Sequence, residues 1–251
     1  MTLHLSSLVP SVSQRHLADQ MIAHAVPIQR TSWQSTSAPS AAHELHNVVL
    51  EFKVPDSLKL WQEQCQADLP WAEDHFQERV SGQPLNPPPS SAYWPWYSEK
   101  ERQKFVNGEA GRFDHTYPER YWPSHYGSDG YTFYGNLNDV CKLLRSDPWT
   151  RQAYLPVWFP EDTGVTQSQR VPCTLGYHFI RNGAALDCNY FIRSCDLTRH
   201  YKNDIYLTGR LLQWVVDSID SKNHPEFPYP GTLTVFISNL HLFTQDAWRF
   251  K

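Results

Sequence analysis

The sequence contains no long hydrophobic run and no excess of positive charge. No apolar stretch approaches the ~20 residues that a membrane-spanning helix needs, so we expect no membrane partner. Residues 1–20 lack a basic leader followed by a long apolar run, which is the pattern of a secretion signal. The 22 Lys and Arg residues against 26 Asp and Glu residues give a formal charge of −4, which argues against a general nucleic-acid binder. A small anionic ligand is compatible with this charge, because a few local arginines can hold one phosphate.

Cysteine is scarce as well, and its spacing argues against two common uses. The five cysteines are an odd number and form no CxxC pair; they are Cys65, Cys141, Cys173, Cys188 and Cys195. This pattern suits free thiols in a reducing cytoplasm better than a disulfide or zinc framework. We therefore expect a cytoplasmic protein without a metal site.

The remaining composition is typical of a globular protein. Hydrophobic residues make up 40% of the chain, with ten Trp and thirteen Tyr, and 251 residues can bury one sizeable core. Apolar spacing predicts helices at residues 12–26, 70–80, 137–144 and 205–219, and strands at residues 46–54, 153–159, 173–181, 185–193 and 232–242. This order predicts a mixed α/β or α+β fold, with a single domain over residues 1–251.

Two segments show little periodicity. Residues 34–42 are rich in Ser, Thr and Ala, and we predict a mobile loop there. Residues 84–134 include three consecutive prolines, which favour an extended connector, and are then dense in Trp, Tyr, Gly and Pro. We interpret this second segment as loop-rich chain that lies over a site.

The most informative motif is RSCD at residues 193–196, followed eight residues after its aspartate by Asp204. A lone cysteine such as Cys173 is by default a small buried hydrophobe, but here an arginine and a serine follow twenty residues later. Those two side chains suit a phosphate beside a thiolate. With PC at 172–173 and NLH at 239–241, the pattern resembles the active-site core of the thymidylate synthase superfamily. The resemblance implies a mixed sheet flanked by helices, with one sheet face used to form a homodimer.

The resemblance also implies a transferase acting on C5 of a pyrimidine nucleotide. Cys173 would add to C6 and thereby make C5 nucleophilic, and Arg193 would lower the pKa of the thiol by proximity. Tyr117 resembles the family tyrosine near the reacting base. A glutamate on the helix at 70–80 would organise water and transfer protons; Glu73 and Glu78 compete for this role, and Glu73 has the better distance to the following tryptophans.

The same resemblance implies which residues bind the nucleotide. Arg193 and Ser194 would bind the phosphate, with Arg30 as a further candidate. Arg151 would reach across the dimer interface into the neighbouring site. His241 would bind the 3′-hydroxyl of the sugar.

The one-carbon donor that the resemblance implies is 5,10-methylenetetrahydrofolate, used as a co-substrate. Trp94 and Trp96 resemble the tryptophan pair that flanks folate and pyrimidine, and Asp196 would hold the pterin ring. No metal is implied.

Asp204 stands where the thymidylate-forming members carry an asparagine. Asparagine can donate to O4 and accept from N3–H of uracil, whereas an ionised carboxylate only accepts and suits the 4-amino group of cytosine. The resemblance is therefore closest to the deoxycytidylate (dCMP) hydroxymethylase branch, which makes 5-hydroxymethyl-dCMP and would work in host cytoplasm if phage-encoded. Ser194 favours dCMP over CMP, because ribonucleotide-using relatives have a smaller residue there. A register shift by one residue would put Asn203 in this place instead.

Two alternatives stay open. One is methylation, or a dUMP or CMP substrate, within the same type of enzyme. The other is a non-catalytic nucleotide-binding protein, because Gln152 replaces the second of two family arginines and Phe243 replaces a tyrosine. The sequence also stops at Lys251, whereas relatives continue and close over folate.

Overall fold

A computed structural model of the chain describes residues 3–6, 8–30, 40–103, 111–123, 135–163, 170–219 and 229–251. Its centre is a mixed β-sheet with the strand order β1-β3-β8-β6-β5-β4, in which β2 pairs with β3 and β7 pairs with β8. The strands are β1 (Leu3–Leu5), β2 (Ile28–Arg30), β3 (Ser40–Lys53), β4 (Tyr154–Pro156), β5 (Thr174–Asn182), β6 (Ala185–Ile192), β7 (Cys195–Asp196) and β8 (Tyr229–Phe243).

The long strand β8 joins the two halves of the sheet. It runs antiparallel to β3 and parallel to β6 and β7. β5 and β6 form an antiparallel hairpin whose turn contains Gly183, at a φ of 61° that glycine adopts without strain. The NG pair at 182–183 is thus a turn, as the sequence predicts.

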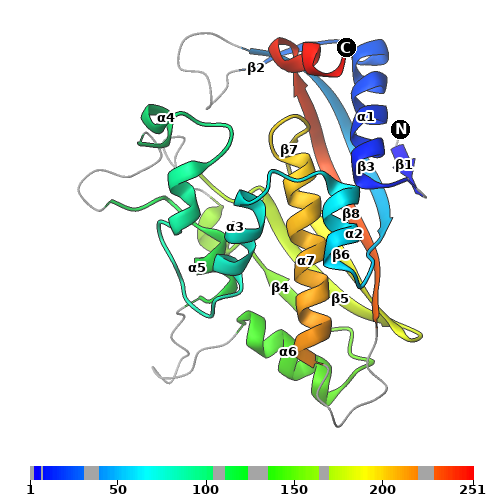
Figure 1. Ribbon diagram of the computed structural model, residues 1–251, viewed down its shortest axis with the longest axis vertical. Coiled ribbons are helices and arrows are strands. Elements are labelled where there is room, and N and C mark those ends of the chain that lie inside the picture. Colours follow the sequence, from blue (N-terminus) through cyan, green and yellow to red (C-terminus); the bar gives the residue numbers. More distant parts are fainter. Residues whose placement is uncertain are drawn as a thin grey trace.

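Helices pack against this sheet, and α7 is the central one (Figure 1). α2 and α3 lie beside α7, and α6 contacts it near its C-terminal end. The α-helices are α1 (Pro10–His24), α2 (Leu58–Cys65), α3 (Trp71–Arg79), α4 (Glu99–Gln103), α5 (Tyr117–Tyr121), α6 (Leu137–Ser146) and α7 (Tyr201–Ile219), and the 3-10 helices are η1 (Pro89–Tyr93), η3 (Pro160–Asp162) and η4 (Thr244–Phe250). None of the helices in these ranges is both long and apolar enough to cross a membrane.

The core lies between α7 and the sheet. Along β6, buried side chains alternate with partly exposed ones, and Leu186, Cys188, Tyr190 and Ile192 are on the buried side. α7 buries apolar side chains along its whole length and contacts both β6 and β8. Each large apolar side chain removed from water contributes roughly 1.5–3 kcal/mol, so this layer fixes the position of α7 over the sheet.

The structure confirms the mixed α/β fold and most of the predicted elements. Several elements differ from the prediction, among them the short strands β1, β2 and β7, which were not predicted. α2 was not predicted, η1 lies in the expected proline-rich connector, and β3 begins at Ser40, so the end of the predicted loop at 34–42 is strand. The segment at 84–134 also contains α4 and α5. Residues 31–39, 104–110 and 124–134, on which parts of these predictions fall, lie outside the described residues.

Candidate active site

One cavity opens between α3, α7 and the chain that leads into β5. Its walls come from α3, the stretch after η1, the stretch that enters α5, residues 170–173, and the region from Ser194 into α7. Six residues that the sequence predicts for the site line this cavity: Cys173, Asp204, Tyr117, Ser194, Trp94 and Trp96. The fold therefore brings together a candidate nucleophile, a candidate base-recognition residue and aromatic side chains from distant parts of the sequence.

Cys173 is partly exposed at the start of β5, and its position is fixed by Arg193. The backbone N–H of Arg193 donates to the carbonyl oxygen of Cys173 at 2.9 Å. The Arg193 guanidinium donates to the carbonyl oxygens of Pro172 at 2.8 Å and Val171 at 3.2 Å. Burial raises the pKa of the Cys173 thiol above its usual value, and Arg193 opposes that shift. Arg193 lowers the pKa of the thiol, as the sequence predicts, but the effect of burial is larger and the net shift is upward.

Tyr117 is fixed by a chain of hydroxyl groups. Its Oη lies 2.9 Å from Oγ1 of Thr174, which lies 2.9 Å from Oη of Tyr190. Burial raises the pKa of Tyr117, so it is a neutral phenol at neutral pH. Tyr117 therefore presents a positioned, uncharged ring beside Cys173.

Asp204 faces the cavity from the first turns of α7. Burial raises the pKa of its carboxyl group from 3.8 to about 7, while the nearby charge of Arg79 lowers it. The neighbouring Asn203 also lines the cavity, but its side chain is engaged with Asp68. Asn203 Nδ2 donates to the Asp68 carboxylate at 2.9 Å, and its Oδ1 accepts from the Asp68 backbone N–H at 2.9 Å. Asp204 is thus the better placed of the two candidates to meet a ligand.

Asp196 is buried at the end of β7. Its Oδ1 accepts backbone hydrogen bonds from Thr198 at 2.9 Å and Arg199 at 3.1 Å. Its Oδ2 is buried and accepts no hydrogen bond from any described residue, although the Arg199 side chain lies 3.8 Å away. A buried carboxylate oxygen without a hydrogen-bond donor is a place where a ligand N–H can bind.

Neither glutamate of α3 lines the cavity. Glu73 forms a salt bridge with Arg210 at 3.0 Å and accepts from the Tyr206 hydroxyl at 2.5 Å. Glu78 accepts from the backbone N–H of Ser90 at 2.6 Å and from its hydroxyl at 2.5 Å. Burial alone would raise the pKa of each carboxyl group, but these hydrogen bonds outweigh it and lower both pKa values. Both groups are therefore ionised and already engaged.

Four predicted nucleotide-binding residues do not line the cavity, and one of them is Arg193, whose guanidinium donates to the two backbone carbonyl oxygens named above. Arg151 is exposed just before β4. His241 lies on β8 with its ring centre 5.2 Å from that of Phe243. Arg30 ends β2, and its side chain lies outside the described part of the structure.

Three cavity residues on α3 were not predicted, namely Trp71, His75 and Arg79. They recur every fourth residue, so one face of α3 forms a wall of the cavity. Arg79 is buried, and its guanidinium carbon lies 3.9 Å from the centre of the Tyr117 ring. The four-residue spacing was readable in the sequence, but charged residues at that spacing usually form a solvated face.

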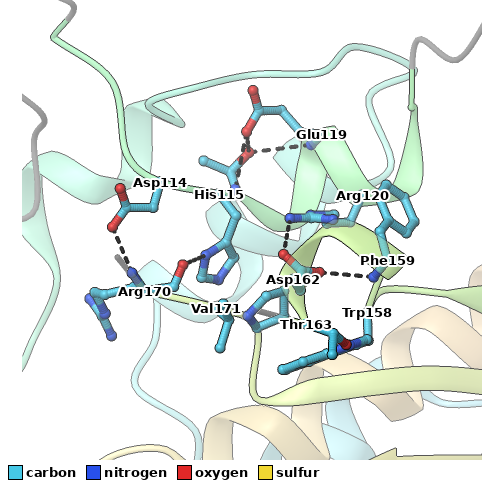
Figure 2. A network of polar contacts seen from close by, with 12 residues as sticks. Asp114, His115, Glu119, Arg120, Trp158, Phe159, Asp162, Thr163, Arg170 and Val171 are labelled. Atoms are coloured by element: carbon cyan, nitrogen blue, oxygen red, sulfur yellow. Dashed lines mark hydrogen bonds and ion pairs between the residues drawn. The ribbon is translucent and has the colours of Figure 1, made fainter. Parts of the chain in front are cut away.

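A polar network holds the chain that precedes Cys173 (Figure 2). The Asp114 carboxylate accepts from the backbone N–H of Arg170 at 2.8 Å. Nδ1 of His115 lies 3.1 Å from the carbonyl oxygen of Arg170. Burial lowers the pKa of His115 to about 4, so the ring is neutral at pH 7 and donates its Nδ1–H to that oxygen. In the same view, Arg120 donates to the Asp162 carboxylate at 2.8 Å.

The described residues contain no group of three His, Cys, Asp or Glu side chains that could hold a metal ion. The cavity lining offers thiol, carboxyl, imidazole, guanidinium and aromatic side chains.

Comparison with known proteins gives one family and two relatives. The family model described as thymidylate synthase matches residues 56–249. A protein named "Putative thymidylate synthase" from Methanosarcina barkeri (strain Fusaro / DSM 804) is 25% identical over 176 residues, which cover 69% of this chain and 70% of the relative. A protein of the same name from Methanococcoides burtonii (strain DSM 6242 / NBRC 107633 / OCM 468 / ACE-M) is 26% identical over 151 residues, covering 59% of this chain and 62% of the relative. The matched part of this chain includes the cavity and all of its lining residues.

Proposed function

Since this chain belongs to the thymidylate synthase family, we propose that it transfers a one-carbon unit to C5 of a pyrimidine nucleotide. The preferred nucleotide is dCMP, and the product is 5-hydroxymethyl-dCMP. The observation that carries this proposal is that Cys173 and Asp204 line the same cavity.

Cys173 is the nucleophile in this proposal. Its thiolate adds to C6 of the pyrimidine ring, and the electrons displaced from the C5–C6 double bond make C5 nucleophilic. Arg193 supports this role, because it holds the backbone around Cys173 and its charge favours the thiolate. A bound nucleotide phosphate would lie near the same arginine and Ser194. Arg30 and Arg151 are further phosphate ligands in this proposal.

Asp204 distinguishes the bases. In its ionised form it accepts from the 4-amino group of cytosine and opposes the O4 acceptor of uracil. In its protonated form it can also donate to N3 of cytosine. A pKa of about 7 makes both forms available near neutral pH. The engagement of Asn203 with Asp68 supports Asp204 as the residue that meets the base.

Methylenetetrahydrofolate, when bound, supplies the one-carbon unit. Trp94 and Trp96 fit it, because they offer apolar ring surface in the cavity wall. Asp196 lies outside the residues that line the cavity, and its buried Oδ2 has no hydrogen-bond donor among the described residues. Asp196 would accept from an N–H group of the pterin. His241 remains the proposed ligand of the sugar hydroxyl.

A second candidate is methylation of dUMP. The printed names of both relatives favour it, because each is named "Putative thymidylate synthase". The residue at 204 is the observation that favours cytosine instead. Product mass separates the two outcomes, because 5-hydroxymethyl-dCMP is heavier than the methylated product of dUMP by one NH unit.

The homodimer is part of the same proposal. Arg151 is exposed just before the edge strand β4, which is compatible with a role in a neighbouring subunit. A mixture of Arg151→Ala and Cys173→Ala variants tests this idea. If Arg151 acts across the interface, mixed dimers regain activity that neither variant has alone; an unrestored mixture argues against it.

The experiment that tests the function is tritium release from C5-labelled dCMP and dUMP, with and without methylenetetrahydrofolate. We expect release from dCMP by the wild type and none by Cys173→Ala. Asp204→Asn should shift the preference to dUMP, because an amide can donate to O4. Release from dUMP by the wild type would contradict the base assignment, and release from neither would favour a non-catalytic nucleotide-binding protein.

A further inference from the structure

His75 occupies the middle of the α3 face that lines the cavity. Its side chain is only 7% exposed, and its ring stacks on Trp71 with centres 5.0 Å apart and planes 17° apart. Trp71 in turn packs edge-on against Trp96 at 4.8 Å. These contacts fix the plane of the imidazole, so its two nitrogens point in defined directions.

The Nδ1 side of the ring faces a serine and a carboxylate. Nδ1 lies 3.0 Å from Ser90 Oγ and 3.3 Å from Glu78 Oε2. Ser90 uses its hydroxyl proton to donate to Glu78 Oε2 at 2.5 Å. Because neither neighbour has a proton left to give, Nδ1 must carry one and donate it. The other ring nitrogen, Nε2, is then an acceptor with a lone pair.

Nε2 is the nitrogen left for a ligand in the cavity. Within the described chain, both hydrogen bonds of the His75 ring involve Nδ1, and the residue is part of the cavity wall. Cys173 and Tyr117 line the same cavity. His75 therefore presents a proton acceptor to the space in which a pyrimidine ring bound to Cys173 would lie.

The charges around His75 suit a base. Burial and the charge of Arg79 lower the pKa of His75 to about 4, while Glu78 opposes this shift. The ring is thus neutral at pH 7 and about as basic as an ordinary carboxylate side chain. Glu78 itself is ionised, so it stabilises the imidazolium that forms when Nε2 takes a proton.

Other candidate groups are less suited to removing a proton from the pyrimidine. Of the three cavity histidines in the described residues, His75 is the one hydrogen-bonded to a carboxylate; His115 bonds to a backbone carbonyl, and His200 packs edge-on against Trp96. The carboxylate of Glu73 is engaged by Arg210 and Tyr206 away from the cavity.

We propose that His75 is the base that removes the proton from C5 of the pyrimidine, and that Glu78 and Ser90 are its positioning residues. This inference rests on the function proposed above and extends it. With Cys173 Sγ bonded to C6, C5 first bonds to an electrophile, which is the one-carbon unit or, in the exchange assay, a proton from solvent. The C5–H bond then breaks and its electron pair forms the double bond between C5 and C4. The π electron pair of the C4–N3 bond moves to N3, which takes a proton from solvent or from Asp204, and the C5 proton goes to Nε2 of His75. The imidazolium then gives the proton to solvent. The glutamate expected on this helix would thus act through His75 instead of touching the ring.

The test separates the addition of Cys173 from the loss of the C5 proton. Tritium release from C5-labelled dCMP, without folate, measures proton loss. Adduct formation with 5-fluoro-dCMP and methylenetetrahydrofolate, followed by mass spectrometry, measures addition, because C5 then carries fluorine instead of a removable proton. We expect His75→Gln to slow tritium release roughly 100-fold and to keep the adduct. His24→Gln, on the exposed side of α1, is the matched control and should change neither.

A second variant, His75→Ala, distinguishes a chemical role of His75 from a purely structural one. His75→Ala leaves space next to Trp71, and added imidazole should restore part of the tritium release. Restoration by imidazole is not expected if His75 only supports the structure. Unchanged tritium release in both variants would overturn the inference.

Glu78→Gln tests the positioning role. Glu78 raises the pKa of His75, whereas burial and Arg79 lower it; Ser90 from η1 and Trp71 are uncharged. Removing the Glu78 charge should lower the pKa of His75 further. The acid limb of the tritium-release profile should therefore move to lower pH, together with a roughly tenfold slower rate above it. A slower rate with an unmoved acid limb would contradict the role of Glu78.

The two proposals fail in different ways. If the wild type forms no adduct and releases no tritium, the proposed function fails and this inference falls with it. If the wild type does both and His75→Gln is equally active, only the role of His75 is wrong.

Discussion

At the scale of single residues, the titration of Asp204 makes the stability of the folded protein depend on pH. Its pKa rises from 3.8 to about 7 on folding, so the folded state keeps a proton that the unfolded state has already lost. The contribution of this group to stability is present below pH ~4 and is lost as pH rises to about 7, by at most ~1.4 kcal/mol per pH unit. Asp204→Asn has no such group. We therefore expect the variant to gain stability over the wild type between pH 5 and pH 8, measured by thermal unfolding at both values.

An equal difference between the two proteins at pH 5 and pH 8 would contradict this prediction. Comparing variant with wild type at each pH cancels the titration of other groups, including the cavity histidines.

Arg79 sets where Asp204 titrates. The guanidinium lowers the pKa of this carboxyl group against the larger effect of burial. Arg79→Met removes the charge and keeps much of the packing against Tyr117, so the pKa of Asp204 should rise above 7. Carbon-13 NMR titration of the Asp204 carboxyl measures this shift. Arg79→Lys keeps the charge, so in this variant Asp204 should titrate close to its wild-type midpoint. An unchanged Asp204 midpoint in Arg79→Met would contradict the prediction.

All four of these residues line the cavity, but the sequence analysis singled out only Cys173 and Asp204, and not Arg79 and His75. The first two belong to a motif with fixed spacing, whereas the last two stand on a helix with charges on several sides. Their burial depends on residues that fold against α3 from elsewhere, such as Tyr117 and Ser90. Sequence periodicity contains no information about which distant residue covers a helix face.

At the scale of elements, one buried salt bridge joins α5 to η3. Arg120 and Asp162 meet at 2.8 Å with side chains 10% and 6% exposed, and Asp162 also accepts from the Phe159 backbone N–H (Figure 2). Asp162→Ala would leave the Arg120 charge buried without its partner. We expect a loss of roughly 3–5 kcal/mol in the free energy of unfolding, measured by urea denaturation.

The exposed pair Lys59–Glu63 provides the control, because its side chains are 86% and 61% exposed. Glu63→Ala should cost less than about 1 kcal/mol. Similar losses in the two variants would mean that burial of the Arg120–Asp162 pair does not determine its contribution.

The contact between α2 and α7 depends on Gly209. A Cβ atom at this position would lie 2.3 Å from the Trp61 ring, which is fully buried and donates from Nε1 to the Tyr206 carbonyl oxygen. Alanine favours a helix over glycine by ~1 kcal/mol, but overpacking a core costs about 1–3 kcal/mol. Gly209→Ala should therefore lower the denaturation midpoint. His16→Ala, on the exposed face of α1, is the control and should leave the denaturation midpoint unchanged within experimental error. A higher midpoint in Gly209→Ala would contradict the close approach of Gly209 to the Trp61 ring.

The longer strands and helices were predictable because their apolar spacing is regular, whereas the short strands β1, β2 and β7 were not predicted. β6 alternates strictly between buried and partly exposed side chains, and α7 is the longest apolar helix. α2 was missed because it has only eight residues, of which just Trp61 and Cys65 are buried. Its position is set by the fit of Trp61 over Gly209, a tertiary contact that no local pattern reveals.

At the scale of the whole molecule, the five thiols differ in access. Cys173 is partly exposed at the cavity, whereas the other four are buried. We expect a thiol reagent to label one cysteine quickly in the folded protein and all five after unfolding. Burial raises the pKa of Cys173, so its labelling should be slower than that of a free thiol and should accelerate with pH.

Mass spectrometry after brief labelling counts the modified thiols. Cys173→Ser should show none in the folded state, and dCMP should protect Cys173 in the wild type. Rapid labelling of a second cysteine in the native protein would contradict the burial described here.

The order of the strands was not predictable from the residue pattern. Alternation shows that residues 46–54 and 232–242 form strands, but it does not show that they pair with each other. Their pairing depends on side chains and backbone groups that meet only in the finished sheet, such as Val48 opposite Ile237.

The place of β8 in the middle of the sheet has a consequence for the newborn chain. On a ribosome that adds ~5–20 residues per second, β3 emerges roughly 10–35 s before β8. During that interval the edge of β3 that later pairs with β8 has no native partner. The unpaired backbone N–H and C=O groups of such an edge can form hydrogen bonds with other chains. We therefore expect synthesis of this protein to depend on chaperones that shield β3 until translation has delivered the strand that closes the sheet.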